Sequence, residues 1–279
     1  MQASVVWNPP TGTLGAIVAE ARDRVQTLRA GEVELVRRAE GAPAAPPFSS
    51  ALQTTAVGVI AEVKRRSPSK GWINPNLSAV DQALAYERGG ASALSILTEP
   101  KHFGGSVQDL EAVRAAVKIP ILKKDFHVDP IQLVEAKAIG ASAALLIVRA
   151  LSPDSLREMI DTAAALRLEV LVEIRDESEL QRALDAGALI IGINNRNLET
   201  LVIDPATSER LLGLVPGSVV AIAESGVSGR ADVERVAASG ADAVLVGSSI
   251  SAAADPSAAV ADLSDVTRVP RRLRMSTDV

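Results

Sequence analysis

The sequence predicts an α/β fold, a (β/α)8 TIM barrel that carries an N-terminal helical extension. Eight short runs rich in Val, Ile and Leu follow one another from residue 57 onward. Ala-rich amphipathic stretches separate these runs, and several of them end in Gly just before the next run. Strands that alternate with helices form a parallel sheet, and eight such units close a barrel. An open doubly wound sheet is the alternative, but it would usually contain fewer strands.

The segment 1–56 is predicted to hold the helical extension and a connector. Six apolar residues at helical spacing predict an amphipathic helix that ends near Gly31: Leu14, Ile17, Val18, Ala21, Val25 and Leu28. A second short helix is expected over residues 32–39. Gly12 and Gly15 weaken the start of the first helix. The segment GAPAAPPF at 41–48 ends regular structure, because successive prolines cannot continue a helix.

The barrel itself is predicted to span residues 57–265. Its strands are expected at 57–63, 93–98, 119–124, 143–148, 169–174, 189–194, 219–224 and 242–247. The preceding helices end in YERGGAS, AKAIGAS, ALDAGA and VAASGAD, where a glycine can take the left-handed conformation that turns the chain back into the sheet. The Arg-rich segment 266–279 is expected to be a mobile tail.

Composition excludes several classes of protein. The net charge of −5 offers no general attraction for nucleic acid or anionic lipid, so an anionic partner needs a local basic site. With no cysteine and two histidines, thiolate and histidine-rich metal sites cannot form, and we expect neither a metal nor a cofactor. No apolar run approaches the roughly 20 residues of a membrane span, and no signal-peptide pattern stands at 1–10. We therefore expect a cytoplasmic protein.

Polar and ionisable side chains gather where the predicted strands end. The strand ends contain EVK at 62–64, KKD at 123–125, Glu173, NNR at 194–196, ESG at 224–226 and GSS at 247–249. Side chains alternate along a strand, so Glu62 and Lys64 share one face. By the same alternation, Lys124 points into the barrel and Lys123 points toward the helices. The sequence thus predicts a ring of charges facing one mouth of the barrel.

Taken together, these charges favour a site over scattered surface charge. Solvent-facing charges should occur at both ends of a barrel, yet the predicted strand starts are apolar or small, with Glu169 and Asp242 as exceptions. Active sites of such barrels lie at the C-terminal ends of the strands. For any single charge, an ion pair with a purely structural role is an equally good interpretation.

A phosphate site is predicted in the loops after the seventh and eighth strands. SGVSG at 225–229 and GSS at 247–249 supply glycines for close backbone approach and hydroxyl groups that donate hydrogen bonds. KRRSPSKG at 64–71 adds cations and Ser67 from the neighbouring first strand. Each loop alone is weak support, because Gly and Ser are ordinary turn residues. Together they indicate a small phosphorylated substrate.

These motifs, in this order, resemble the indole-3-glycerol phosphate synthases of tryptophan biosynthesis. The resemblance is carried by AEVKRRSPSKG, ALSILTEPKHFGGS, PILKKDF, VEI, GINNRNLET, AESG and VLVGSS, which lie within roughly residues 10–255. It implies a carboxy-lyase that closes the ring of 1-(2-carboxyphenylamino)-1-deoxyribulose 5-phosphate, releases carbon dioxide and then water, and forms indole-3-glycerol phosphate. It also implies that the helical extension covers the barrel mouth.

The resemblance assigns catalytic roles to the strand-end residues. Lys124 matches the general acid of ring closure. Glu173, Glu62 and Lys64 match the acid and base groups of dehydration, and the distribution of proton transfers among these three stays open. The residues that match substrate-positioning groups are Asn194, Glu224 and Ser225.

Binding roles follow from the same resemblance. The residues that match the phosphate site are Lys64, Ser67, Gly226, Gly247 and Ser248, and Arg196 matches an organiser of this region. Phe103 and Phe126 are expected to contact the aromatic ring of the substrate, with ordinary core packing as the alternative. His102 is given no catalytic role, and His127 is expected to satisfy a loop hydrogen bond.

Two other functions compete with this interpretation. Another phosphate-binding barrel enzyme, such as phosphoribosylanthranilate isomerase, relies on a cysteine base that this chain lacks. A non-catalytic phosphometabolite-binding barrel would have lost at least one of Lys124, Glu173 and Lys64. The expected partner is a small phosphorylated substrate, without nucleic acid or membrane. A monomer is expected, with weak association with other enzymes of the tryptophan pathway.

Overall fold

Eight parallel strands close into a barrel in the computed structural model, which describes residues 7–271. The strands are β1 (Gly58–Val63), β4 (Ala93–Leu97), β5 (Ile121–Lys124), β6 (Ala143–Ile147), β7 (Glu169–Ile174), β8 (Ile190–Asn194), β9 (Val220–Glu224) and β10 (Ala243–Val246). β1 pairs with both β4 and β10, which closes the sheet. The predicted (β/α)8 barrel is confirmed, and every strand lies within the range expected from its apolar run.

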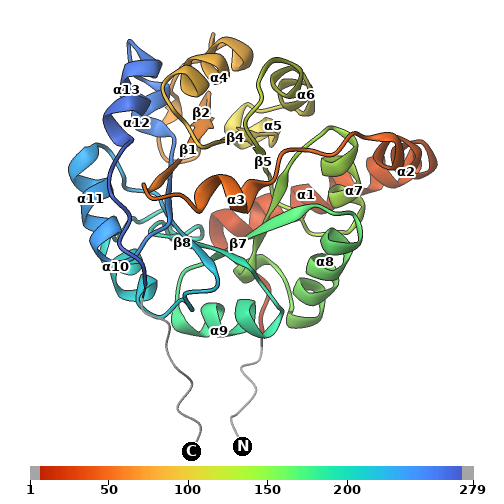
Figure 1. The fold of residues 1–279 in the computed structure, drawn as a ribbon. Coiled ribbons are helices and arrows are strands. Elements are labelled where there is room, and N and C mark those ends of the chain that lie inside the picture. The colour runs from red at the N-terminus through yellow and green to blue at the C-terminus, as the bar shows by residue number, and fades with distance from the viewer. Residues whose placement is uncertain (1–6, 272–279) are drawn as a thin grey trace, which may run out of the picture.

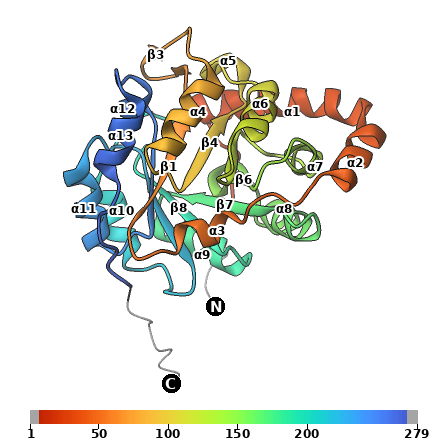
Figure 2. The same ribbon diagram turned by 45° about the horizontal axis from the view of Figure 1, so that its top comes forward.

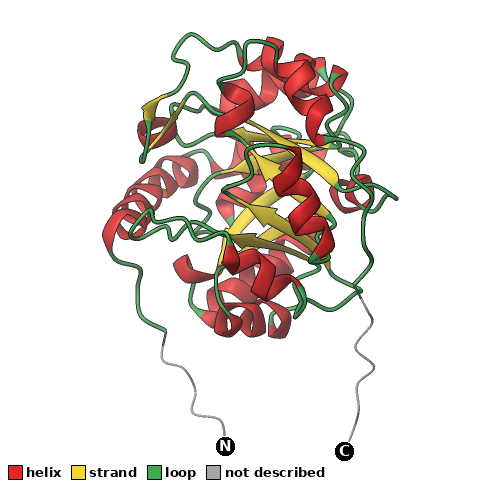
Figure 3. Cartoon of the chain, turned by 90° about the vertical axis from the view of Figure 1, so that its left-hand side faces the viewer, coloured by secondary structure: helices red, strands yellow, loops and turns green. Residues whose placement is uncertain are grey.

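Helices cover the outside of the strands (Figure 3). They are α4 (Ala79–Arg88), α6 (Val107–Ala116), α7 (Ile131–Ala138), α8 (Pro153–Ala165), α9 (Glu177–Asp185), α10 (Ala206–Leu212), α11 (Arg230–Ala238) and α13 (Pro256–Leu263). Positive φ angles occur at Gly90, Gly140, Gly187 and Gly240, the four positions where the sequence predicts a turn from helix to strand. No helix among residues 7–271 is both long enough and apolar enough to cross a bilayer.

Short elements surround the C-terminal ends of the strands. The hairpin of β2 (Arg66–Ser67) and β3 (Gly71–Trp72) follows β1. After β4, β6 and β10 come α5 (Pro100–Phe103), the 3-10 helix η1 (Val148–Ala150) and α12 (Ser248–Ser251). The sequence does not predict these elements, because two to four residues are too few to produce a periodic pattern.

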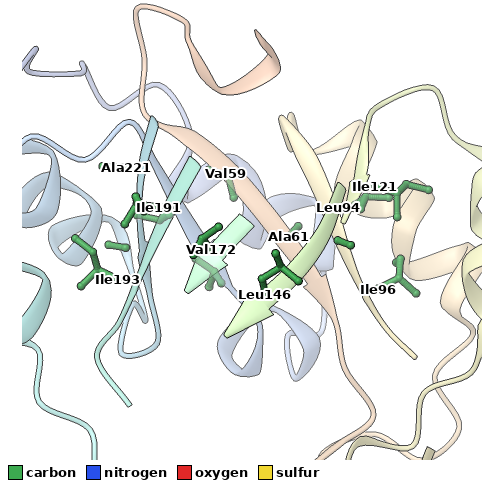
Figure 4. Close-up of a cluster of buried hydrophobic side chains, with 14 of the residues drawn as sticks. Val59, Ala61, Leu94, Ile96, Ile121, Leu146, Val172, Ile191, Ile193 and Ala221 are labelled. Atoms are coloured by element: carbon green, nitrogen blue, oxygen red, sulfur yellow. The ribbon is translucent and has the colours of Figure 1, made fainter. Parts of the chain in front are cut away.

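Alternate strand side chains form two separate apolar layers. Val59, Ala61, Leu94 and Ile96 belong to the layer between strands and helices (Figure 4). Residues of the opposite parity fill the barrel interior, among them Ile60, Leu122, Leu171 and Ile222. Lys123 is fully buried under the helix layer, with its Nζ 2.6 Å from Glu135 Oε2 on α7. The predicted inward and outward directions of strand side chains are therefore confirmed.

The N-terminal extension consists of α1 (Gly12–Ala30) and α2 (Glu32–Gly41). α2 lies beside α7 (Figure 2), where Leu35 and Val25 pack with Ile131. Gly12, at the start of α1, has a φ of +57°, and a Cβ atom there would lie 2.6 Å from the carbonyl oxygen of Glu199. This glycine weakens a helix in isolation, but here it lets the start of α1 approach the loop after β8.

The strand-start end of the barrel is covered by α3 (Phe48–Leu52), a helix that the sequence does not predict (Figure 1). Phe48 and Leu52 are fully buried and belong to the apolar cluster that fills the barrel interior. Glu169, at the start of β7, accepts the backbone N–H groups of Phe48 and Ser49 at the N-terminus of this helix. A carboxylate is favourable there because the helix dipole is positive at that end.

The first part of the predicted mobile tail, residues 266–271, packs against the same end of the barrel. The backbone N–H of Val57 donates to Val266 O at 2.8 Å. Arg268 Nη1 and Arg271 Nη2 lie 2.9 and 2.7 Å from the two oxygens of Asp242. Asp242 is buried, and a buried charge is stable only when it is paired. The remainder of the predicted tail, 272–279, lies outside the described residues.

Arg271→Ala is expected to lower the free energy of unfolding. Arg271 also donates to Gly240 O and Val219 O, so the change removes three contacts of a buried guanidinium group. Arg268 still pairs with Asp242, so we expect a loss of about 1–3 kcal/mol and a Tm lower by about 2–8 °C. Thermal unfolding followed by circular dichroism measures this. Arg37→Ala, which removes an exposed pair with Glu34, is the control, and an equal effect of the two changes would contradict the prediction.

Candidate active site

A cavity of about 270 Å³ lies at the C-terminal ends of the barrel strands. Leu14 and Ile17 of α1 form part of its wall, so the extension covers the mouth as predicted. The structure brings together every residue that the sequence predicts for the site: Glu62, Lys64, Ser67, Phe103, Lys124, Phe126, Glu173, Asn194, Arg196, Glu224, Ser225, Gly226, Gly247 and Ser248 all line this cavity.

Two lysines and three carboxylates form the floor of the cavity. Lys124 Nζ lies 2.5 Å from Glu224 Oε2 and 3.5 Å from Glu173 Oε2. Lys64 Nζ lies 2.5 Å from Glu62 Oε1. The three glutamates are 2–4% exposed. We call these five residues the charged floor; their ordinary charges add to one net negative charge.

The pKa values of the charged floor shift in different directions. Burial raises the pKa of Glu224 well above its ordinary value, and the charges of Glu173 and Glu62 add to this although Lys124 opposes it. For Glu62, burial acts in the same direction, but Lys64 and Lys124 outweigh it and lower the pKa. Burial lowers the pKa of Lys124, yet the surrounding carboxylates raise it overall. These groups titrate as a coupled set. The set can therefore accept a proton at Glu224 while Lys124 stays charged.

Polar neighbours orient two of the carboxylates. Asn194 Nδ2 donates to Glu173 Oε1 at 2.9 Å. Ser95, a fully buried residue of β4, donates to Glu62 Oε2 at 3.4 Å. Sequence reasoning missed Ser95, although its place two residues after the inward-facing Ala93 could have indicated that its side chain points into the barrel.

Two glycines leave room for the charged floor. A Cβ atom at Gly192 on β8 would collide with Glu224 Oε1. A Cβ atom at Gly247, after β10, would collide with Glu62 Oε1 and come within 2.9 Å of Lys64 Nζ. The sequence predicts Gly247 as part of a phosphate-binding loop. It does not predict a need for glycine at 192, because that need comes from Glu224 on the neighbouring strand β9.

The predicted phosphate residues converge from three loops. Ser225 and Gly226, after β9, line the cavity in a turn where their φ angles are +63° and +86°. Gly247 precedes α12, and Ser248 begins it. Ser67 reaches the same cavity from β2. Ser249 also lines the cavity, and its buried Oγ has no hydrogen-bond partner within residues 7–271.

An aromatic wall faces the charged floor. The ring centroids of Phe103 and Phe126 are 6.1 Å apart, and both side chains line the cavity. Arg196 lies nearby and joins two loops, because its Nη1 donates to Leu201 O at 3.2 Å and to Ser69 Oγ at 3.1 Å. The cavity thus combines an apolar surface for a flat ring with donors for anionic groups.

The histidines do not line this cavity. His127 is buried, and its Nδ1 lies 2.7 Å from Leu145 O, which agrees with the predicted hydrogen-bonding role. His102 Nε2 lies 2.8 Å from Glu20 Oε2 on α1. Glu20, Glu99 and His102 form a group whose ligand atoms lie within 4.8 Å of one another, but the carboxylate of Glu99 already accepts three backbone N–H groups at the start of α5. These residues therefore tie α1 to α5.

The extension is also joined to the strand that carries Lys124. Arg24 of α1 donates to both oxygens of Asp125, at 2.7 and 3.3 Å, and Thr98 Oγ1 donates to Asp125 at 2.6 Å. Asp125 directly follows Lys124 and is buried. The sequence does not predict this contact, because nothing distinguishes Arg24 from the other charged residues on the polar face of this amphipathic helix.

Arg24→Gln is expected to reduce both stability and turnover. The change removes a bidentate ion pair from a buried carboxylate, and charged hydrogen bonds of this type contribute about 1.5–3 kcal/mol. A small displacement of Lys124 would lower kcat by about 10- to 100-fold. Steady-state kinetics and thermal unfolding measure both effects. The control is Arg22→Gln, an exposed residue of the same helix, and full activity of the Arg24 variant would contradict the prediction.

The barrel and its cavity define a class of protein: (β/α)8-barrel enzymes with a lysine and carboxylate site covered by an N-terminal extension. The indole-3-glycerol phosphate synthase family model matches residues 14–263. The chain belongs to the indole-3-glycerol phosphate synthase family.

Individual relatives agree with this assignment. The chain is 53% identical over 230 residues to the indole-3-glycerol phosphate synthase of Streptomyces griseus, covering 82% of this chain and 86% of that protein. It is 46% identical over 256 residues to that of Mycobacterium ulcerans, covering 91% and 94%. Among solved structures, 3-hexulose-6-phosphate synthase from Salmonella typhimurium is similar, with a TM-score of 0.60, 15% identity, and coverage of 74% of this chain and 96% of that chain. At this identity the likeness shows the fold alone.

Proposed function

We propose that the protein converts 1-(2-carboxyphenylamino)-1-deoxyribulose 5-phosphate into indole-3-glycerol phosphate, carbon dioxide and water. The observation that carries the proposal is the position of Lys124 in a cavity that also holds two phenylalanine rings and the Gly and Ser loops. This cavity offers complementary surfaces for an aromatic ring, a reacting carbonyl and a phosphate group. The curated relatives named for this activity match most of the chain.

Lys124 is the proposed general acid of ring closure. A ring carbon of the substrate attacks the ketone carbon, and the ketone oxygen must gain a proton as its negative charge develops. A buried ammonium group stabilises that charge strongly because little water competes with it. The contacts of Lys124 with Glu224 and Glu173 hold it at the cavity floor. The cationic ring formed by closure is an electron sink, so carbon dioxide leaves as aromaticity returns.

Dehydration is assigned to Glu173 together with the pair of Glu62 and Lys64. The hydroxyl group made by ring closure must leave as water, and a proton must leave the adjacent carbon. Glu173 and Glu62 lie on different strands around Lys124, and Lys64 accompanies Glu62. Two carboxylates and two ammonium groups therefore supply both the acid and the base.

The remaining residues are proposed to bind and orient the substrate. The phosphate group is placed at Ser67, Gly226, Gly247 and Ser248, with Lys64 as the cation. The aromatic ring is placed against Phe103 and Phe126. Asn194, Glu224 and Ser225 position the polar groups of the sugar chain, and Arg196 maintains the loop above them. Another phosphate-binding barrel enzyme would not need the aromatic wall beside Lys124. A non-catalytic phosphometabolite-binding barrel would not need the intact charged floor.

A fluorescence assay tests the proposed activity. Purified protein with authentic substrate and a metal chelator should produce the fluorescent indole product, which product isolation and mass spectrometry would verify. Phosphoribosylanthranilate is the second substrate offered, and its isomerisation would support the other barrel enzyme. Absence of turnover with the first substrate, together with retained substrate binding, would indicate a non-catalytic barrel instead.

We further propose that the protein acts as a cytoplasmic monomer and associates weakly with other enzymes of the tryptophan pathway. Light scattering of the purified chain tests the monomer. A stable dimer at micromolar concentration would contradict it. Fractionation of the native cells and sedimentation with added pathway enzymes test the location and the association.

A further inference from the structure

A smaller cavity of about 130 Å³ shares part of its wall with the active-site cavity. Glu173 and Asn194 line both cavities. Glu179, in the first turn of α9, and Asp176, directly before this helix, line only the smaller one. Asp176 is exposed to solvent, whereas Glu173 is 4% exposed. The smaller cavity therefore extends from the charged floor toward a solvent-facing residue.

Glu179 is a buried carboxylate with no ion pair among the described residues. The residue is 9% exposed. Its Oε2 accepts the backbone N–H of Arg175 at 2.8 Å, and its own N–H donates to Asp176 Oδ1 at 2.8 Å. These two hydrogen bonds cap the start of α9, but a glutamine oxygen at 179 would accept the N–H of Arg175 equally well. Capping therefore explains the position of Glu179 and leaves the presence of a buried ionisable group unexplained.

The proposed reaction requires a proton from outside the active site. Ring closure adds one proton to the ketone oxygen, and departure of the hydroxyl group as water uses a second. Only one proton returns, from the carbon next to the departing hydroxyl group. The substrate carboxylate leaves as neutral carbon dioxide, so the balance is substrate plus one proton giving product, carbon dioxide and water. One proton must enter the buried charged floor in every turnover.

We propose that Glu179 relays this proton from solvent to Glu173 through the smaller cavity. The inference rests on the proposed reaction. Glu179 gains a proton at the solvent side, then loses it to the carboxylate of Glu173, and returns to its ionised form. Glu173 then gives the proton to Lys124, with which it is in contact, after Lys124 has donated its own proton to the ketone oxygen. A polar cavity of this size has room for water molecules that bridge the two carboxyl groups.

The surroundings of Glu179 suit a group that exchanges protons near neutral pH. Burial raises the pKa of Glu179 to about 7, and the negative charges of Asp176 and Glu173 act in the same direction. The N–H of Arg175 and the charge of Arg182 oppose this shift. The other charged groups that line the smaller cavity are Arg149 from η1, the guanidinium group of Arg175 from the turn before α9, and Arg196 and Glu199 from the loop after β8.

Glu179→Gln tests the relay, because glutamine keeps the cap and removes the exchangeable proton. We expect kcat at low buffer concentration to fall by about tenfold or more, with KM unchanged. Imidazole added as a small proton carrier should restore kcat, an effect that a structural defect would not show. Glu177→Gln, an exposed residue of the same helix that pairs with Arg210, is the matched control. Unchanged kcat in the Glu179 variant, or a loss that imidazole does not restore, overturns the relay.

Infrared titration of the carboxyl groups, made without substrate, tests Glu179 independently of the proposed activity. The parent protein should show protonated carboxyl absorption from Glu179 and Glu224 that disappears near neutral pH. Glu179→Gln should remove the Glu179 contribution, leave that of Glu224, and shift the titration of Glu224. Equal thermal unfolding of the parent and the variant at low pH would show that the cap is intact. If the parent has no turnover, the proposed activity fails. If the parent turns over but Glu179→Gln leaves the protonated carboxyl absorption unchanged, the relay fails.

Discussion

Lys124→Ala is expected to reduce kcat by about 10³-fold or more, because it removes both the general acid and the charge that stabilises the developing oxyanion. Binding should change much less, since the phosphate loops and the aromatic wall remain. Quenching of protein fluorescence by the product measures binding, and indole fluorescence measures turnover. Turnover near that of the parent protein would remove Lys124 from the mechanism.

A second substitution separates proton donation from charge. Lys124→Arg retains a positive charge beside Glu224 and Glu173, but a guanidinium group does not release its proton in proteins. We expect this variant to remain nearly as inactive as Lys124→Ala. Lys118→Ala, on an exposed side chain away from the cavity, is the control and should be fully active. If Lys124→Arg recovered most of the activity, charge stabilisation alone would explain the role of the lysine.

Lys124→Met is also expected to make stability depend more steeply on pH. Without the ammonium group, burial and the other carboxylates raise the pKa of Glu224 further. A carboxyl group whose pKa is higher in the folded than in the unfolded state contributes stability at low pH, and this is lost as pH rises through the raised value. Thermal unfolding should show a larger fall in Tm for the variant than for the parent from about pH 6 to pH 9. Parallel curves would contradict the assigned electrostatics.

The barrel and its inward-facing charges could be predicted because each depends on local periodicity. Alternation along a single strand was enough to choose Lys124 over Lys123, and the structure places Lys123 against Glu135 on α7. Strand ends, helix ends and the charged floor follow from the same rule. The parts that could be predicted are those in which the position of a residue in its own strand or helix decides where its side chain points.

Features that depend on distant parts of the chain could not be predicted in this way. Glu169 and Asp242 stood out as charges at strand starts, but the sequence did not show their partners. In the structure Glu169 accepts hydrogen bonds at the N-terminus of α3, and Asp242 forms ion pairs with two arginines that follow the last barrel helix. Both carboxylates therefore hold a covering segment of the chain against the strand-start end of the barrel. The pairing of Arg24 with Asp125, across 101 positions of sequence, escaped prediction for the same reason.

Glu173→Gln is the substitution that decides how the protons are divided after ring closure. Glutamine retains the size of the side chain and can still accept a hydrogen bond from Asn194. Its amide cannot take up a proton, and its NH2 group would oppose Lys124 Nζ, which lies 3.5 Å from Glu173 Oε2. We expect kcat for formation of the indole product to fall by about 10²- to 10⁴-fold, the usual contribution of a general acid or base.

The order in which carbon dioxide and the indole product appear then shows which chemical step depends on Glu173. If Glu173 acts in dehydration, a single turnover of Glu173→Gln should release carbon dioxide at nearly the parent rate, while indole fluorescence appears much later. Rapid-quench measurement of labelled carbon dioxide and stopped-flow fluorescence compare the two steps. The control is Glu158→Gln, an exposed residue of α8 that lines neither cavity. Equal slowing of both signals would place Glu173 before carbon dioxide loss. In that case Glu62 and Lys64 would carry dehydration, and Glu173 would serve ring closure through Lys124.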